Sequence, residues 1–391
     1  MYKISMVSLG CPKNQVDAEM MLATIKKAGY EIGAPEAEAD AIIINTCGFI
    51  EEAKAEAIEN ILEAAQYKKT GKCKALIVTG CLAERYKNDV TEEIPEVDVC
   101  VGIGADGDIA KIVEKALGGE KRNFFAEKAA LDLNGDRILG SYPFSTYLKV
   151  GDGCDNCCTY CAIPKIRGRM RSRSIEDCVK EAQRLAMGGV KELTVVAQDT
   201  TAYGEDIYGK PMLAVLLREL CRVEGLHWIR TLYTYPDRIT DELLDTVASE
   251  EKLVKYFDIP LQHVNGDILK RMNRKGNYES LSALIDKIRA RIPNVTLRTT
   301  LITGFPRRDR GAVLRACAIC KGKAVRPSRL LYILRRRRYR RSAFSRPDRR
   351  TDKAGPYGQH NGAAADNIGR EKRGKDRNRN RGAYRGLGRL Y

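Results

Sequence analysis

Three cysteines stand close together in the stretch GDGCDNCCTYCAIPK, residues 151–165. Cys154, Cys158 and Cys161 have the spacing C-x-x-x-C-x-x-C and directly follow a predicted β-strand. Three thiolates can bind three irons of a 4Fe-4S cluster and leave the fourth iron open to a small molecule. A structural zinc ion usually takes four ligands in two separated pairs, so zinc and an unligated cluster of core thiols are the weaker alternatives. Cys157 is then a spare thiol.

A second set of cysteines comes from three different loops. Cys11, Cys47 and Cys81, in SLGC, INTC and VTGC, each fall two residues after a predicted strand. The carboxyl ends of parallel strands share one edge of the sheet, so the three thiols are expected to converge there. The alternative is that they are small buried hydrophobes, which better suits Cys73 and Cys100.

The elements that must position the second set occupy residues 1–125. Strand-like and helix-like patterns alternate there, which predicts a small parallel α/β domain. The predicted strands are 3–9, 41–45, 75–79 and 97–101, and the predicted helices cover about 14–28, 51–67 and 106–117.

A polar, turn-rich stretch over 126–142 predicts a linker, and a second α/β series follows over 143–306. Its five strand-helix steps favour a barrel-like sheet over another small sandwich. The predicted strands are 146–150, 192–197, 229–235, 255–259 and 295–302, with helices that include 175–187 and 278–290.

Composition restricts the function classes. The 391-residue chain has no run of about 18 apolar residues and no signal-peptide pattern at its start, which predicts a cytoplasmic protein without a membrane span. Thirteen cysteines in a reducing compartment favour metal or redox chemistry over disulfides. The formal charge of +17 comes entirely from residues 307–391, which hold 27 Lys and Arg against 6 Asp and Glu; residues 1–306 carry a net −4.

Together the two cysteine triads resemble the methylthiotransferase family of radical S-adenosylmethionine enzymes, over roughly residues 1–306. The segments SLGCPKNQVDAE (8–19), YLKVGDGCDNCCTYCAIP (147–164) and VVAQDTTAYG (195–204) are most similar to the branch that modifies ribosomal protein S twelve. The branch that modifies adenosine in transfer RNA differs around its first cysteine and is the alternative. The resemblance implies a radical S-adenosylmethionine (βα) partial barrel after the amino-terminal domain.

The resemblance also implies two 4Fe-4S clusters. Cys154, Cys158 and Cys161 would hold the one that binds S-adenosylmethionine, and the other triad would hold an auxiliary cluster. The implied reaction takes hydrogen from the β-carbon of an aspartate in the ribosomal protein and inserts a methylthio group there. An electron donor and a sulfur source would be needed, and nucleic acid would not.

The implied chemistry requires no acid or base, so no catalytic residue is assigned. Tyr160 precedes the last cysteine of its triad, as is usual in the family, and is a candidate cofactor contact. Gln198 and Arg298 lie after or in predicted strands on the face where barrels place ligand contacts, so they are candidate cofactor contacts. His263 lies on the same face. For this residue a hydrogen-bonded structural role is at least as well supported as contact with cofactor or substrate.

The tail departs from the family pattern. After residues 304–306 the family continues with an acidic helix, a sixth strand and a small β-domain, whereas this chain continues with the basic segment RRDRGAVLRACAICKGK. No apolar period is present there, so 307–391 is predicted to be an irregular basic extension without the last barrel strand. Taken alone, the tail suggests a noncatalytic basic RNA-binding protein as a further alternative.

A change of reading frame is the sharper hypothesis for the tail. Codons chosen for residues 331–344 and read one nucleotide later can encode a strand and loop similar to the family's sixth strand. Under this hypothesis Cys317 and Cys320 form an accidental C-x-x-C. A chain without its last strand and substrate-docking domain is expected to be poorly stable, and weakly active or inactive.

Overall fold

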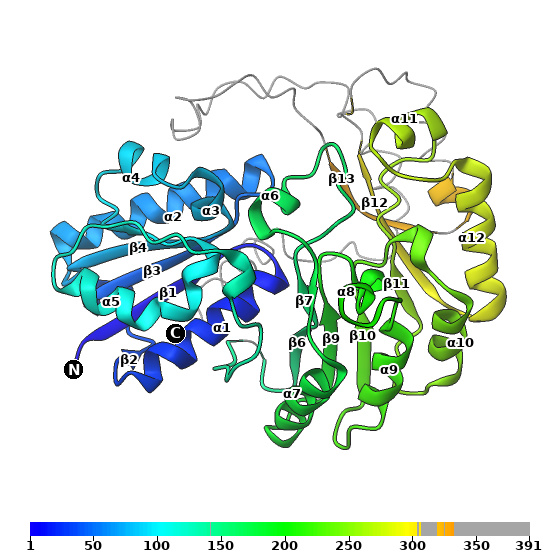
Figure 1. Cartoon of the computed structure of the whole chain (residues 1–391), viewed down its shortest axis with the longest axis horizontal. Coiled ribbons are helices and arrows are strands. Elements are labelled where there is room, and N and C mark those ends of the chain that lie inside the picture. The colour runs from blue at the N-terminus through cyan, green and yellow to red at the C-terminus, as the bar shows by residue number, and fades with distance from the viewer. Residues whose placement is uncertain (141, 303–304, 306–318, 324, 332–391) are drawn as a thin grey trace, which may run out of the picture.

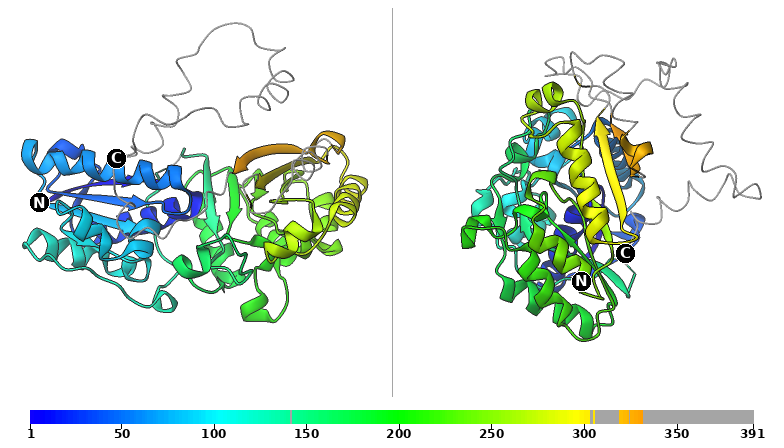
Figure 2. Two further views of the ribbon diagram at one scale, coloured as in Figure 1. Left: turned by 90° about the horizontal axis from the view of Figure 1, so that it is seen from above. Right: turned by 90° about the vertical axis from the view of Figure 1, so that its right-hand side faces the viewer.

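The computed structural model describes residues 1–140, 142–302, 305, 319–323 and 325–331. Two α/β units lie side by side along the long axis of the molecule (Figures 1 and 2). Helices α1 (Pro12–Lys27) and α6 (Ile163–Arg167) lie where the two units meet (Figure 1). Within the described residues, no helix is both long and apolar enough to cross a membrane.

The first unit is a five-stranded parallel sheet in the order β2-β1-β3-β4-β5. Its strands are β1 (Lys3–Ser8), β2 (Glu31–Ile32), β3 (Ala41–Thr46), β4 (Ala75–Gly80) and β5 (Val99–Cys100). Its helices are α1, α2 (Glu51–Thr70), α3 (Cys81–Tyr86), α4 (Asp89–Glu93) and α5 (Ile109–Leu117).

Alternate side chains of the central strands enter two separate cores. Ile42 and Ile44 of β3 pack on one face with Ile58 and Ile61 of α2. Ile43, between them, packs on the opposite face with residues of α1 and α5. Successive strand residues point to opposite faces, so an all-apolar strand such as AIII is the expected sequence for a sheet covered on both sides. The predicted small parallel α/β domain is confirmed.

In the described residues, the second unit has six parallel strands in two groups, ordered β10-β9-β6 and β11-β12-β13. A parallel bridge from Ile229 to Leu253 lies where β10 approaches the second group. The strands are β6 (Ser145–Lys149), β9 (Glu192–Val196), β10 (Trp228–Thr231), β11 (Tyr256–Asp258), β12 (Thr296–Ile302) and β13 (Arg326–Leu331).

Helices cover these strands, and a short antiparallel pair frames the loop of the second cysteine triad. The pair is β7 (Gly151–Asp152) with β8 (Arg171–Ser172). The helices are α6, α7 (Ile175–Met187), α8 (Glu205–Tyr208), α9 (Leu213–Cys221), α10 (Asp241–Ser249), α11 (Gly266–Arg271) and α12 (Tyr278–Arg291).

Strand β13 differs from the prediction that the chain is irregular from residue 307 onward. It pairs in parallel with β12, with a register shift between Thr299 and Thr300. Ile319, Cys320 and Val325 are buried in the core of the second unit. The exposed edge of β12 offers unpaired backbone groups that an extended segment can satisfy, since backbone pairing does not depend on side-chain identity. The predictions for Cys317 and for residues 332–391 lie outside the described residues.

Candidate metal centres

The structure brings the three amino-terminal cysteines to one edge of the first sheet. Cys11, Cys47 and Cys81 follow β1, β3 and β4, which are neighbours in the sheet. Cys47 and Cys81 come directly after their strands and Cys11 comes three residues after its strand, so the offsets are not equal as predicted. The strand ends differ by one residue from those predicted, but the parallel arrangement still places the three loops together.

Glycines allow these loops to approach closely. A Cβ atom at Gly10 (φ +97°) would lie 2.7 Å from Cβ and 3.2 Å from Sγ of Cys47. A Cβ atom at Gly48 would lie 2.8 Å from the Cα atom of Leu82, next to Cys81. Any larger residue at either position would push apart the loops that carry the thiols.

Asn14 ties two of the same loops together from helix α1. Its side-chain amide donates to the carbonyl of Leu9 at 3.1 Å and to the carbonyl of Thr46 at 2.8 Å. These residues flank Cys11 and Cys47, so the position of both thiols depends on this buried amide.

The three thiols differ in their readiness to ionise. Burial raises the pKa of Cys81 to about 12 and also raises that of Cys47. Burial also raises the pKa of Cys11, but the charges of Lys13 and Arg167 outweigh it and bring the net pKa below its ordinary value. The guanidinium of Arg167 donates to Sγ of Cys81 at 3.4 Å, a contact that favours negative charge on this sulfur.

The second triad lies in the loop between β7 and α6. The amide of Cys154 donates to the carbonyl of Gly168 at 3.1 Å, and that of Cys161 donates to the carbonyl of Cys158 at 2.9 Å. Gly153 (φ +81°) is required at the start of the loop, because a Cβ atom there would lie 1.9 Å from the carbonyl oxygen of Arg169. These backbone contacts hold the cysteine loop in one conformation.

Side chains from other elements complete the surroundings of this loop. The guanidinium of Arg274 lies 3.8 Å from Sγ of Cys158 and stacks on the ring of Tyr235, 4.0 Å from its centroid. Asn156 donates to Asp199 at 2.7 Å and accepts from Arg238 at 2.6 Å. Burial raises the pKa of Cys154 to about 12, and the neighbouring thiols add to the shift.

Two family models and several relatives match the two units of the chain. A model described as Uncharacterized protein family UPF0004 matches residues 3–102, and a model of the Radical SAM superfamily matches residues 148–317. The ribosomal protein uS12 methylthiotransferase RimO of Lachnoclostridium phytofermentans is 52% identical over 305 residues, which cover 78% of this chain and 69% of that protein. The chain belongs to the RimO family. RimO of Acetivibrio thermocellus is 49% identical over 315 residues, with the same coverage.

Solved structures of other radical enzymes share the fold. TsrM, a radical S-adenosylmethionine methyltransferase from Kitasatospora setae, superposes with a TM-score of 0.65 at 12% identity, over 85% of this chain and 73% of TsrM. OxsB, a cobalamin-dependent S-adenosylmethionine radical enzyme, superposes with a TM-score of 0.58 at 14% identity, over 82% of this chain and 52% of OxsB. The predicted fold class, an α/β domain followed by a radical S-adenosylmethionine partial barrel, is confirmed.

Both triads are candidate cluster sites. In the described part of the chain, no three His, Cys, Asp or Glu side chains are placed to hold one metal ion. The thiolates of a 4Fe-4S cluster bind different irons, so their sulfur atoms need not converge on one point. Cationic donors face one sulfur of each triad, Arg167 at Cys81 and Arg274 at Cys158, which suits sulfurs that carry negative charge.

Two of the three predicted cofactor contacts, Gln198 and Tyr160, lie near the second triad. Gln198 donates to Asp152 at 2.7 Å, two residues before Cys154, and its side-chain oxygen is buried with no hydrogen-bond partner among the described residues. Tyr160 is close to Cys158, and burial raises its pKa. Arg298 lies 3.8 Å from Asp258 on β11, and no described contact joins it to a triad.

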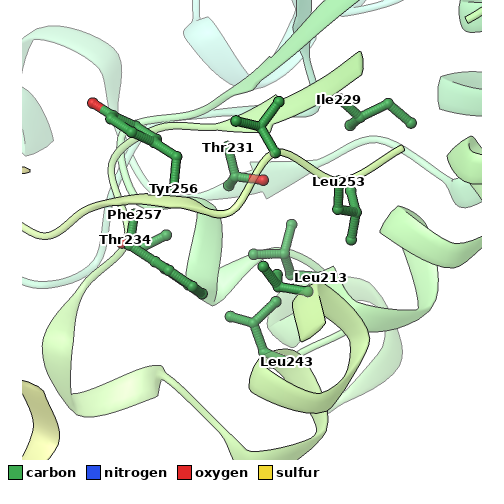
Figure 3. A pocket seen from close by; sticks show the side chains of 10 residues that line it. Leu213, Ile229, Thr231, Thr234, Leu243, Leu253, Tyr256 and Phe257 are labelled. Carbon is green, nitrogen blue, oxygen red and sulfur yellow. The ribbon is translucent and has the colours of Figure 1, made fainter. Parts of the chain in front are cut away.

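A histidine and an apolar pocket lie elsewhere in the barrel. His263 is 1% exposed and accepts a hydrogen bond from the amide of Asn265 at 3.0 Å, which fits a structural role. An apolar pocket between β10, β11, α9 and α10 contains Leu213, Leu243 and Leu253 (Figure 3). These leucines belong to the hydrophobic core of the second unit, and the pocket lining includes none of the six triad cysteines.

A buried charge network joins the two units and was missed by sequence reasoning. Arg167 contacts Asp17 of α1 at 2.6 Å and Asp152 at 3.1 Å, and Lys149 of β6 contacts the same two carboxylates. Arg167 also donates to the side-chain oxygen of Asn14. The network therefore runs from the loop of one triad to the loop of the other.

The predicted linker is also held by buried charge. Arg137 contacts Glu19 of α1 at 2.5 Å and Glu181 of α7 at 2.6 Å. The amide of Ile138 donates to the carbonyl of Glu19 at 3.1 Å. These contacts attach residues 126–142 to both units.

Proposed function

We propose that this chain is a radical S-adenosylmethionine methylthiotransferase that adds a methylthio group to the β-carbon of an aspartate in ribosomal protein uS12. Cys154, Cys158 and Cys161 would hold the 4Fe-4S cluster that binds S-adenosylmethionine. Cys11, Cys47 and Cys81 would hold the auxiliary cluster. The relatives that match this chain over two thirds of their length carry the name of this activity.

One observation carries the proposal. Two sets of three thiols lie on two separate units, and one buried arginine contacts the surroundings of both sets. Arg167 donates to Cys81 and pairs with Asp152, which precedes Cys154 by two residues. A reaction that uses two clusters on one substrate atom requires the two sites to be fixed relative to each other.

When bound, the two clusters and S-adenosylmethionine would supply the one-electron chemistry, the methyl group and the place where sulfur from the sulfur source is held. The protein contributes position and charge. The hydrogen bond from Gln198 to Asp152 fixes the start of the cysteine loop, and the unpartnered oxygen of Gln198 is an acceptor available to a cofactor. Arg274 and Tyr160 stand beside Cys158, where they can stabilise negative charge on its sulfur and exclude water.

Tyr160, Gln198 and Arg298 are the residues we propose as cofactor contacts, and Arg298 is the one with least support from its position. The further participants are an electron donor, a sulfur source and the ribosomal protein. Because the substrate is a ribosomal protein, we propose that the reaction takes place in the cytoplasm. Nucleic acid is not required by this reaction.

Expression in cells that lack their own enzyme tests the proposal. We expect mass spectrometry of uS12 to show the gain in mass for one hydrogen replaced by a methylthio group, located on an aspartate. The Cys154→Ala variant should abolish the modification, and Cys73→Ala, which removes a thiol outside both triads, should keep it. Methylthiolated adenosine in transfer RNA with unmodified uS12 would favour the transfer-RNA reaction instead. Binding of RNA without either product would favour a noncatalytic protein.

A further inference from the structure

Lys13 is a buried cation beside the amino-terminal triad. It is the second residue of α1 and follows Cys11 by two positions. The residue is only 7% exposed, and its ammonium lies 3.5 Å from the centroid of the Tyr233 ring. Tyr233 belongs to the barrel, two residues after the end of β10, so Lys13 reaches from one unit to the other.

The charge of Lys13 has no carboxylate partner in the described residues. Lys149 and Arg167 are also buried, and both make ion pairs with Asp17 and Asp152. The groups that act on Lys13 are Cys11, Tyr233 and Arg167, of which the last repels it. An aromatic face attracts a cation but does not neutralise it, and an ammonium has three N–H donors to offer. The Cys11 thiolate is the counter-charge already present, and the three N–H donors of the ammonium can serve a second anionic group as well.

Tyr233 is held in a backbone conformation that side chains rarely adopt. Its φ angle is +62°. The strain is maintained by hydrogen bonds on both sides: its carbonyl accepts from the amide of Thr200 at 3.1 Å, and its amide donates to Asp258 at 3.5 Å. Strained residues of this kind are concentrated at functional sites, where the surrounding structure fixes one orientation. Here the fixed orientation places the ring against the Lys13 ammonium.

We propose that Lys13, positioned by the ring of Tyr233, binds the side-chain carboxylate of the aspartate that receives the methylthio group. The inference rests on the proposed function and adds a substrate-binding residue to it. The β-carbon of an aspartate is bonded directly to its carboxylate carbon. When that β-carbon lies near the site held by Cys11, its carboxylate therefore falls within a few ångströms of the same loop, where Lys13 stands.

The experiment compares the affinity of the iron-loaded protein for two forms of uS12. One form carries the target aspartate, and the other carries asparagine there. The unaltered protein should bind the aspartate form roughly 10- to 100-fold more tightly, as expected for a charge-assisted hydrogen bond to a buried ammonium. Lys13→Met should bind both forms with similar affinity. Lys26→Met, which removes an exposed lysine from the same helix, should keep the preference.

Further variants separate binding from folding and from cluster assembly. Lys13→Gln removes the charge but keeps a polar side chain, so it replaces Lys13→Met if the latter does not fold, with the same expected loss of preference. Tyr233→Phe keeps the aromatic face and should retain the preference, whereas Tyr233→Leu should reduce it. The iron content of the Lys13 variants should equal that of the unaltered protein.

The inference is overturned if either Lys13 variant still prefers the aspartate form. It is also overturned if both Lys13 variants lose their iron together with the preference, because Lys13 would then serve only as a counter-charge to the cluster ligands. Failure of the unaltered protein to bind either form, with no modification of uS12 in cells, would contradict the proposed function itself and is distinguishable from both results.

Discussion

Replacing Arg167 by methionine tests whether the buried charge network holds the two units together. In the native protein two cations, Arg167 and Lys149, face two carboxylates, Asp17 and Asp152. All four side chains are at most 6% exposed. Methionine fills similar space but leaves the two buried carboxylates with Lys149 as their single counter-charge.

The expected loss of stability follows from the burial of these four charges. Removing one partner of a buried ion pair typically costs about 3–5 kcal/mol, because the remaining charge is left uncompensated away from water. A loss of this size lowers the Tm by on the order of 10 °C for a protein of this kind. Arg184→Met is the matched control, because Arg184 is 49% exposed and its ion pair with Asp136 lies at the surface. That variant should lose no more than about 1 kcal/mol.

Urea unfolding followed by circular dichroism measures both variants and a double-mutant cycle with Asp17→Asn. Removing Asp17 together with Arg167 restores one carboxylate to one ammonium, so the double variant should be more stable than the sum of the two single losses predicts. The coupling should exceed roughly 1 kcal/mol. The reasoning is refuted if Arg167→Met costs no more than the surface control, or if the two losses simply add.

Two further predictions concern a buried carboxyl group and the cofactor contact. Burial raises the pKa of Asp106 to about 8, so the folded protein keeps a proton that the unfolded chain loses above about pH 4, and stability falls as pH rises by up to about 1.4 kcal/mol per unit. Asp106→Asn removes this dependence on pH, so the free energy of unfolding of the variant, relative to that of the unaltered protein, should increase between about pH 6 and pH 8 in urea unfolding. A difference that stays constant with pH would contradict the raised pKa of Asp106. Gln198→Ala should weaken S-adenosylmethionine binding by roughly tenfold in calorimetry of the iron-loaded protein. Gln66→Ala, on the exposed face of α2, is the control and should leave the affinity unchanged. Equal affinities of the two variants would show that Gln198 does not contact the cofactor.

Spacing and strand order made the thiols predictable. The loop with Cys154, Cys158 and Cys161 is local in sequence, so its spacing alone indicates a shared ligand. Cys11, Cys47 and Cys81 are far apart in sequence, but the rule that parallel strands end at one edge brings them together. The strand ends differ by one residue from those predicted, so the cysteines do not follow their strands at equal distances. The rule still holds, because it depends only on the edge at which parallel strands end.

The contacts between units could not be predicted in the same way. Arg167 and Asp17 are separated by 150 positions, and nothing in the local pattern around either indicates a partner. Lys13 and Tyr233 meet only because the two units are docked. Strand β13 was missed for another reason: its six residues lack an apolar pattern, and their pairing depends on the open edge of β12.

The central claim is that the two cysteine triads hold two separate clusters, and iron content measures it directly. After anaerobic reconstitution the unaltered chain should hold about eight irons, and Cys47→Ala and Cys158→Ala should each reduce this to about four by removing one cluster. The buried Cys73→Ala variant should retain about eight. Absence of iron in the unaltered protein, or the same content in all three variants, would contradict the account.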